Sequence, residues 1–165
     1  MVPNVGLNVS LRRATPDDEP FLLDVYASTR EEEWAGLGWD DNQTRAFIRM
    51  QFLVRERSYP RGDDRIILMN GRAIGRMLVN RTDSGILLTD IALLTEYRNA
   101  GIGTGLIQDL MKEAAESAKP LHLHVLETSP AVRLYERLGF SRLGTDAAYL
   151  EMKWDPTASI KNPGA

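Results

Sequence analysis

Gly101 and Gly103 stand between an apolar stretch and a segment with helical spacing, within residues 98–105. Gly101 and Gly103 lack the side chains that would keep a ligand away from the backbone. The helix that follows offers unpaired N–H groups and the positive end of its dipole, and Arg98 can give a phosphate two charged hydrogen bonds. This pattern predicts a pyrophosphate site, although glycine-rich turns also occur for packing alone.

Two common phosphate-binding motifs do not fit this run. A Walker loop requires Gly-Lys followed by Ser or Thr, which is absent. A dinucleotide fingerprint requires a third glycine where the chain has Leu106, and it opens an early βαβ unit, whereas this turn comes late. A nucleotide-dependent oxidoreductase is therefore the third-ranked function.

The turn depends on flanking elements that hydrophobic spacing predicts. Asn70 and Gly71 tolerate positive φ and predict a tight hairpin, and Thr15 before Pro16 predicts the start of a helix. The second helix is predicted to bury a stripe of Ala46, Phe47, Met50, Leu53 and Val54. We expect strands near residues 9–13, 65–69, 73–79, 86–94, 121–126, 141–144 and 148–154, and helices near residues 16–30, 44–57, 102–118 and 131–138.

These elements predict one mixed sheet domain of the α/β (α+β) class, in the order β-α-α-β-β-β-α-β-α-β-β. We expect a single domain over residues 9–154, with terminal tails at residues 1–8 and 155–165. The element order alone does not name a function.

Two motifs resemble the signatures of the GNAT superfamily of N-acetyltransferases. Residues 90–103 resemble the acetyl-CoA motif, a hydrophobic strand followed by Arg/Gln-x-x-Gly-x-Gly/Ala and a helix. Residues 130–140 resemble the second signature, the Leu-Tyr-x-x-x-Gly-Phe helix. The resemblance implies a GNAT-like acyl-CoA N-acyltransferase fold with acetyl-CoA as co-substrate. It also implies a cofactor cleft between two splayed parallel strands, which end at Leu94 and Leu126.

The resemblance also implies which residues hold acetyl-CoA. The backbone of Ile91, Ala92 and Leu93 would pair with the pantetheine arm, and Thr128 stands where many members carry an Asn that holds this arm, which puts its role in doubt. Thr95 stands where many members have Pro and should matter little. The pyrophosphate would be held by Arg98, Asn99, Gly101, Ile102, Gly103 and Thr104, of which the last could instead cap the helix.

The resemblance assigns the leaving group's acid to Tyr135, on the tyrosine that faces the thioester sulfur in the family. A phenol with a reference pKa of about 10 stays protonated until the thiolate leaves. The alternative is that Tyr135 simply packs in the core. The general base is open. Asp90 is the nearest acid on the central strand, but strand alternation puts it out of phase with Leu87, Thr89 and Ile91, the positions that usually face the acceptor in this family, so a structural role is favoured at least equally.

The segment between the first two helices usually walls the acceptor site in this family. Here it contains Glu32, Glu33 and Trp34, which together with Thr89 are the predicted substrate-binding residues. Carboxylates beside an indole ring would attract a cationic amine, although a charged run of this kind is as often a solvated turn. His122 and His124 share a strand face, but two histidines without a third ligand do not predict a metal, so none is expected.

Composition narrows the remaining classes. The 165 residues include no Cys and carry a formal net charge of -3, which argues against a thiolate site and a general nucleic-acid binder. Without a signal peptide or a long apolar run, we expect a cytoplasmic protein with no membrane partner, as a monomer or homodimer. The predicted function is acetyl transfer from acetyl-CoA to a primary amine of a small molecule or peptide; the runner-up is a non-catalytic acyl-CoA-binding or protein-interaction module.

Overall fold

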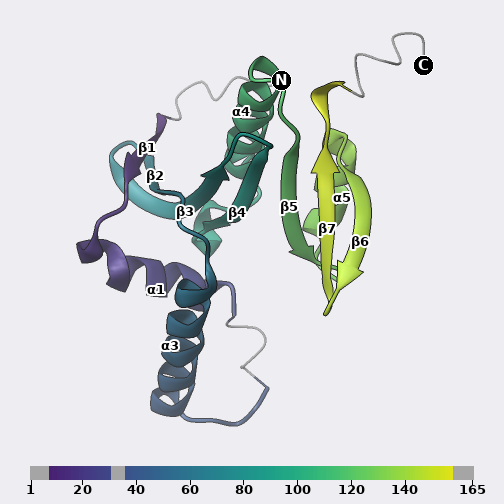
Figure 1. Ribbon diagram of the computed structural model, residues 1–165. Helices are drawn as coiled ribbons and strands as arrows, with labels where there is room; N and C mark the ends of the chain where they lie inside the picture. The colour runs from purple at the N-terminus through teal and green to yellow at the C-terminus, as the bar shows by residue number, and fades with distance from the viewer. Residues whose placement is uncertain (1–7, 31–35, 158–165) are drawn as a thin grey trace. The chain divides into compact units, whose positions relative to one another are not determined.

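The computed structural model describes residues 8–30 and 36–157 and confirms the predicted mixed sheet and element order (Figure 1). In this part of the chain, seven strands form a sheet in the order β1-β2-β3-β4-β5-β7-β6. The pairs β1–β2, β5–β7 and β6–β7 are antiparallel, and β4–β5 is parallel. The strands are β1 (Val9–Arg13), β2 (Asp63–Met69), β3 (Arg72–Arg81), β4 (Ile86–Leu93), β5 (Leu121–Leu126), β6 (Ser141–Asp146) and β7 (Tyr149–Trp154).

Helices connect these strands at the predicted places, with ends displaced by at most three residues. Two short 3-10 segments, which spacing does not reveal, precede α1 and follow β4. The helices are η1 (Pro16–Asp18), α1 (Glu19–Ser28), α3 (Asp41–Ser58), η2 (Thr95–Tyr97), α4 (Ile102–Glu116) and α5 (Ala131–Leu138). No helix within the described ranges combines the length and apolar character that a membrane crossing requires.

The chain divides into two compact units, and β3 and β4 each pass from one into the other. Unit 1 comprises residues 1–78 and 90–103, and unit 2 comprises residues 79–89 and 104–165. The expectation of a single domain over residues 9–154 stays a prediction.

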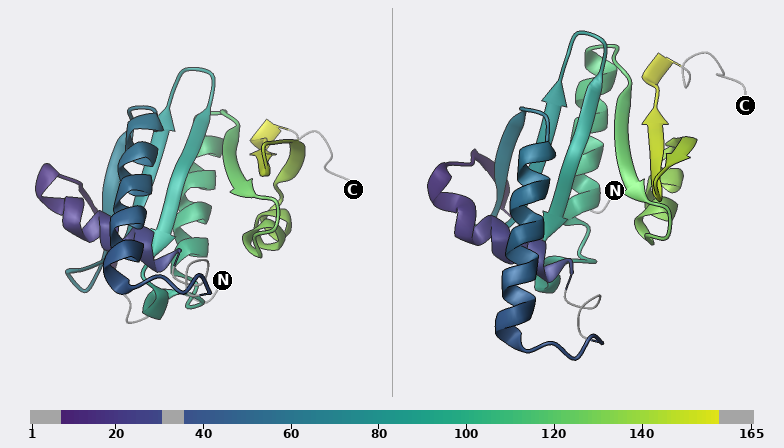
Figure 2. Two further views of the ribbon diagram at one scale, coloured as in Figure 1. Left: turned by 90° about the horizontal axis from the view of Figure 1, so that it is seen from below. Right: turned by 60° about the horizontal axis from the view of Figure 1, so that its bottom comes forward.

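In unit 1, α1 and α3 pack on each other and on β2 (Figure 2). The buried residues at this junction are Leu22 and Tyr26 of α1, Ile48 and Phe52 of α3, and Ile66 of β2. The hairpin between β2 and β3 turns through the left-handed residues Asn70 (φ 52°) and Gly71 (φ 80°), as predicted. Burial of these apolar side chains is the main stabilising contribution at this junction.

The predicted apolar stripe of α3 is wrong at Ala46, Met50 and Val54, which are exposed, whereas Leu53 packs against the core as predicted. Met50 and Val54 are 54% and 62% exposed, and the inward face instead carries Ile48 and Phe52, which is 2% exposed. Arg55 and Glu56 belong to this inward face, because residues four, seven and eight positions apart share one side of a helix. The stripe prediction counted only apolar residues, whereas ion pairs with other elements satisfy these two charges.

Unit 2 contains β5, β6, β7, α5 and most of α4. On α4, Leu106, Ile107, Leu110 and Ala114 recur at helical spacing and are buried. Ala118 lies beyond the helix in a left-handed conformation (φ 54°) and is exposed. In the sheet of this unit, Leu121 pairs with Trp154 and Leu123 with Met152, so apolar side chains follow one another across the β5–β7 ladder.

The entry into α1 depends on the buried carboxylate of Asp18. Its oxygens accept hydrogen bonds from both terminal nitrogens of Arg12 (2.8 Å each) and from the backbone N–H of Thr15 (2.8 Å). The hydrogen bonds from Arg12 and from Thr15 lower the pKa of Asp18 below its usual value, and burial opposes them only in part. The ionised form therefore stabilises the folded state.

We expect Asp18→Ala to lower the free energy of unfolding by about 1–3 kcal/mol at pH 7, the range for hydrogen bonds to a charged group. Since the folded-state pKa is lowered, the stabilisation is present above the unfolded-state pKa of about 4 and is lost as the pH falls below it. The difference between the proteins should therefore shrink in urea titrations below pH 4. Asp17→Ala, at an exposed neighbour, is the control.

Candidate functional site

The predicted glycine turn belongs to unit 1 and changes direction sharply before α4. Asn99 (φ 62°) and Gly101 (φ 82°) both adopt the left-handed conformation, and α4 begins at Ile102. Arg98 before them is extended (φ −78°, ψ 161°), and the first N–H groups of α4 follow directly, where the helix dipole favours an anion. The pyrophosphate site at this turn stays a prediction.

Gly103 is not required by the protein's own packing. A Cβ added there would meet no described heavy atom within 4 Å, and the residue has no positive φ. At Gly101, the left-handed φ explains the glycine, and a Cβ would also point into open space. The two positions thus leave room beside the turn, which fits the requirement of a pyrophosphate for close backbone approach.

The Arg98 side chain does not extend freely from the turn. Its Nε donates a hydrogen bond to the Leu93 carbonyl (3.0 Å), and its Nη2 donates one to the Ser28 hydroxyl at the end of α1 (3.2 Å). The guanidinium thus contacts the end of β4 and the end of α1. The sequence predicts no partner for it on either element.

The predicted arm-binding residues lie at the end of β4. The parallel ladder with β5 pairs Ile86–Leu88 with Leu121–Leu123, and β4 continues beyond it to Leu93. Ile91, Ala92 and Leu93 are half-buried. Their backbone lies beyond the part of β4 that pairs with β5. The pairing of this backbone with a pantetheine arm stays a prediction.

Asp90 points to α3, where its Oδ1 lies 3.6 Å from Nη2 of Arg55. The Arg55 guanidinium in turn covers the rings of Tyr26 (5.4 Å to the centroid) and Tyr59 (5.2 Å). Burial raises the pKa of Asp90 above its usual value, and the positive charges of Arg55 and Arg76 only partly offset this. A carboxylate with a raised pKa accepts a proton more readily, which is what a general base near neutral pH requires.

A second buried charge lies beside this group. The guanidinium of Arg76, on β3, donates two hydrogen bonds to Asp64 (2.9 Å each) and one to Glu56 (2.7 Å). It also covers the Tyr59 ring at 5.6 Å. The sequence analysis does not predict this network. The feature that could have indicated it is Arg76 itself, which stands alone inside the apolar run of β3, because an arginine is almost never buried without a partner.

Two buried hydroxyls have no hydrogen-bond partner within residues 8–30 and 36–157. They belong to Tyr59 and to Thr89, the β4 residue predicted to bind the acceptor. Burial and the nearby Asp90 charge raise the pKa of Tyr59, so its hydroxyl stays protonated. An unpartnered buried hydroxyl is costly unless a ligand or water satisfies it.

Tyr135 belongs to unit 2, where it is 7% exposed on α5 and its ring lies 5.7 Å from that of Phe140. α5 ends at Gly139 (φ 104°), and the Phe140 N–H donates to the Tyr135 carbonyl (3.0 Å). Thr128 is exposed and lines a pocket of about 370 Å³ together with Arg133 and Arg142.

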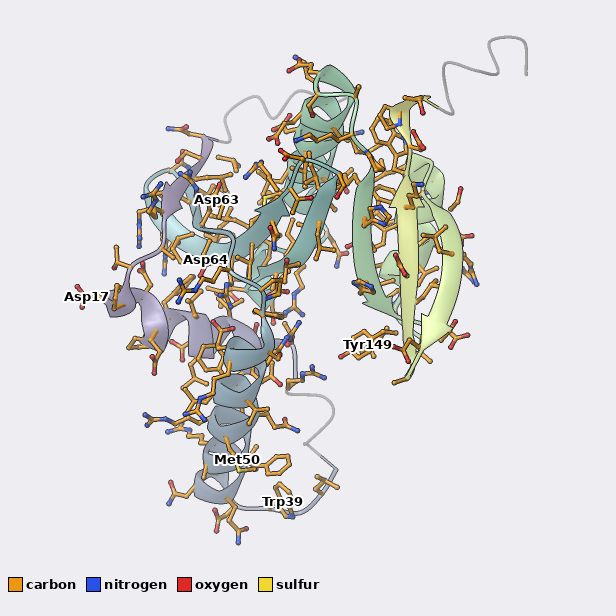
Figure 3. All side chains as sticks on the ribbon, in the orientation of Figure 1. Asp17, Trp39, Met50, Asp63, Asp64 and Tyr149 are labelled. Atoms are coloured by element: carbon orange, nitrogen blue, oxygen red, sulfur yellow. The ribbon has the colours of Figure 1, made fainter. Side chains whose placement is uncertain are left out.

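The remaining predicted residues give less information. Glu32, Glu33 and Trp34 lie outside the described residues. Trp39, labelled in Figure 3, packs edge-to-face against Phe47 of α3, with 5.3 Å between the ring centroids. His122 lies 3.4 Å from Glu151, and no cluster of three metal-ligating side chains occurs among the described residues.

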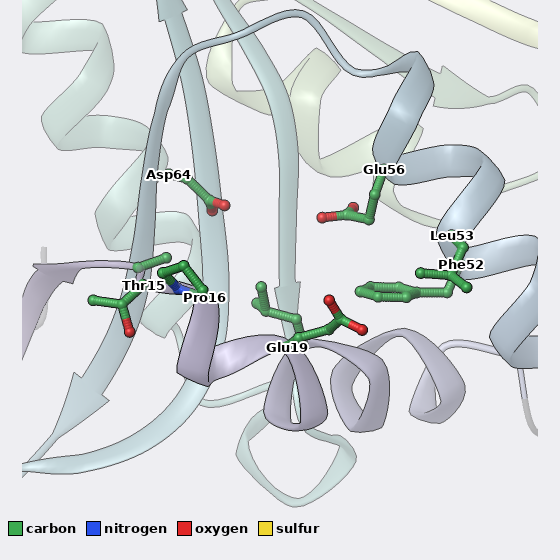
Figure 4. Close-up of a pocket in the computed structure, with 9 residues that line it drawn as sticks. Thr15, Pro16, Glu19, Phe52, Leu53, Glu56 and Asp64 are labelled. Atoms are coloured by element: carbon green, nitrogen blue, oxygen red, sulfur yellow. The ribbon is translucent and has the colours of Figure 1, made fainter.

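Unit 1 also contains a pocket of about 300 Å³ between η1, α1, α3 and β2. Its wall is apolar at Leu22 and Phe52, and Glu56 and Asp64 extend into it from opposite sides (Figure 4). These two carboxylates are the partners of Arg76. No residue that the sequence predicted for the site lines this pocket.

Comparisons with known proteins agree with the motifs. A family model described as an acetyltransferase (GNAT) domain matches residues 51–142. An N-alpha-acetyltransferase of Sulfurisphaera tokodaii is 42% identical over 59 residues, which span 34% of this chain and 35% of that protein. The match thus covers about a third of the relative's length.

Solved structures show the same fold over most of the chain. PaiA N-acetyltransferase from Thermoplasma acidophilum, in complex with coenzyme A, is 19% identical, with a TM-score of 0.67 over 90% of this chain and 99% of that one. An acetyltransferase from Thermus thermophilus is 15% identical, with a TM-score of 0.65 over 89% and 96%. The GNAT-like fold is confirmed, and since the family model covers more than half of the sequence, the chain belongs to the GNAT family of acetyltransferases.

Proposed function

We propose that this protein transfers the acetyl group of acetyl-CoA to a primary amine, by direct attack of the amine within a ternary complex. The observation that carries the proposal is the turn before α4, where left-handed Asn99 and Gly101 lead directly into the first N–H groups of the helix and Gly103 leaves open space. Membership of the GNAT family supports acetyl-CoA as the donor.

The cofactor would lie along the residues that the motif marks. The N–H groups of the turn, from Asn99 through Gly101, Ile102, Gly103 and Thr104, would bind the pyrophosphate, aided by the dipole of α4. The backbone of Ile91–Leu93 would pair with the pantetheine arm, and Thr128 would contact it through its hydroxyl.

Two proton transfers accompany the acetyl transfer. A protonated amine must lose a proton before its nitrogen attacks the thioester carbonyl, and the C–S bond then breaks to release a thiolate that must gain one. We propose that Asp90, whose raised pKa fits a base, accepts the proton of the amine. We propose that the Tyr135 hydroxyl donates a proton to the thiolate. The products are an acetylated amide and free CoA thiol.

The acceptor proposed is the primary amine of a small molecule or of a peptide terminus. The match to an N-alpha-acetyltransferase supports the terminus. Thr89 has a buried hydroxyl without a partner in the described structure, which a bound acceptor would satisfy. Glu32, Glu33 and Trp34 stay predicted acceptor residues.

The proposed function is tested by measuring free thiol release from acetyl-CoA with a panel of small amines and short peptides. Release that depends on one of these amines supports the transferase. Tight binding of acetyl-CoA without release for any amine would instead favour a non-catalytic acyl-CoA-binding module.

We expect Gly103→Val to abolish the rise in melting temperature that acetyl-CoA causes in the wild-type protein. A ligand that binds only the folded state stabilises it by mass action, and valine would fill the space that the pyrophosphate needs. Differential scanning fluorimetry with and without acetyl-CoA measures the shift. Gly144→Val is the control, because that strand glycine also faces open space, away from the motif. An undiminished shift in Gly103→Val would place the phosphate site elsewhere.

A further inference from the structure

The end of β4 is held unusually closely by β3. A Cβ added to Gly75 would overlap the Ala92 carbonyl oxygen and would lie 2.8 Å from Cδ2 and 3.1 Å from Cα of Leu93. The Leu94 N–H donates to the Ile74 carbonyl (2.9 Å) beside this approach. Glycine is therefore required at position 75 for the two backbones to come this close.

The same stretch is held from another direction by Arg98. Its Nε donates to the Leu93 carbonyl (3.0 Å), so the turn folds back on the strand from which it started. Its Nη2 donates to the Ser28 hydroxyl (3.2 Å), and this hydroxyl itself donates to the Val25 carbonyl in the last turn of α1 (2.7 Å). A cation is favourable at the C-terminal end of a helix, which strengthens the contact.

These two hydrogen bonds use the Nε–Nη2 edge of the Arg98 guanidinium, an edge that can bind both oxygens of an anion. Arg76 shows this geometry in the same unit, because its Nε and Nη2 bind the two oxygens of Asp64. In Arg98 the corresponding nitrogens bind the neutral oxygens of Leu93 and Ser28. The parallel, two-bond recognition of a phosphate by this edge is therefore not open to Arg98 while these contacts hold.

We propose that Arg98 is a positioning residue that joins the end of β4 to α1, rather than a ligand of the pyrophosphate. This inference rests on the proposed function. Together with Gly75, Arg98 sets where the backbone of Ala92 and Leu93 meets the pantetheine arm. A displacement of about 1 Å at such a site can lower the rate by about 10²-fold, so the contact matters although it touches neither phosphate nor acceptor.

The two roles make different predictions for a donor without a pyrophosphate. We would measure kcat/KM by thiol release with acetyl-CoA and with acetyl-pantetheine, for the wild-type protein, Arg98→Lys and Ser28→Ala. A positioning residue should affect both donors: we expect Arg98→Lys to lower kcat/KM about tenfold or more for each, and Ser28→Ala to lower it for each by a smaller factor. Lysine keeps the charge but not the planar fork, so it should not substitute.

The inference is overturned if Arg98→Lys or Arg98→Gln loses activity with acetyl-CoA alone, or if neither donor is affected. Ser28→Ala keeps the result interpretable if the Arg98 variants fold poorly, because it removes only one hydroxyl and leaves the guanidinium in place. Equal kcat/KM in this variant and the wild type for both donors also overturns the inference. Absence of thiol release in the wild-type protein, by contrast, would contradict the proposed function itself.

Discussion

Asp90→Asn is expected to lower kcat/KM for acetyl transfer by about 10²–10⁴-fold at pH 7, the usual contribution of a general base. The amide keeps the shape of the carboxylate but cannot accept the proton of the amine. The deficit should narrow as the pH rises, because a growing fraction of the amine is already deprotonated. Thiol-release rates between pH 6 and pH 9 measure both effects.

Stability should change in the opposite direction to activity. Because burial raises the pKa of Asp90, the folded state binds its proton more tightly than the unfolded state does. The wild-type protein therefore loses stability as the pH rises from the unfolded-state pKa of about 4 through the raised folded-state value. Asp90→Asn lacks this loss and should be at least as stable as the wild type at pH 8.

The opposite pair of results would identify Asp90 as a purely structural partner of Arg55. In that case Asp90→Asn would unfold at lower temperature and keep its turnover. Asp109→Asn, at an exposed position of α4, is the matched control and should change neither property. The ion pair of 3.6 Å alone does not decide between the two roles.

The order of the elements could be read from the sequence because each carries a strong local signal. Asn70 and Gly71 specify the hairpin through their left-handed φ, and Gly139 ends α5 in the same way. The glycine turn could be placed for the same reason, since Gly101 needs its positive φ whatever surrounds it. These features depend on a few neighbouring residues and not on the tertiary structure.

Side-chain partners could not be read in this way. Arg98 was assigned to a phosphate by its place in the motif, yet its contacts are with Ser28, seventy positions earlier in the chain, and with Leu93. The inward face of α3 was missed because Arg55 and Glu56 find their partners on β4 and β3. A periodicity argument treats a charge as exposed, and only the folded contacts show which charges are paired.

Arg76→Met is expected to lower the free energy of unfolding by about 3 kcal/mol. Breaking a buried ion pair typically costs about 3–5 kcal/mol, because it leaves an uncompensated charge. The lower end of this range applies here. The Arg76 side chain is 7% exposed, but the side chains of Glu56 and Asp64 are 25% and 31% exposed, so water can hydrate the two carboxylates once the arginine is gone. Urea titration at pH 7 measures the change.

A rescue variant shows whether charge or packing causes this loss. Burial alone would lower the pKa of Arg76, but its hydrogen bonds to Asp64 and Glu56 outweigh this and raise it, so the two carboxylates stabilise the charged guanidinium. If unpaired charge is the cause, adding Glu56→Gln and Asp64→Asn to Arg76→Met should restore most of the lost stability, because neutral groups of the same shape no longer repel each other. Arg72→Met, at the exposed start of β3, should have little effect. A triple variant as unstable as Arg76→Met would show instead that the guanidinium acts mainly through its packing on Tyr59, at 5.6 Å from the ring.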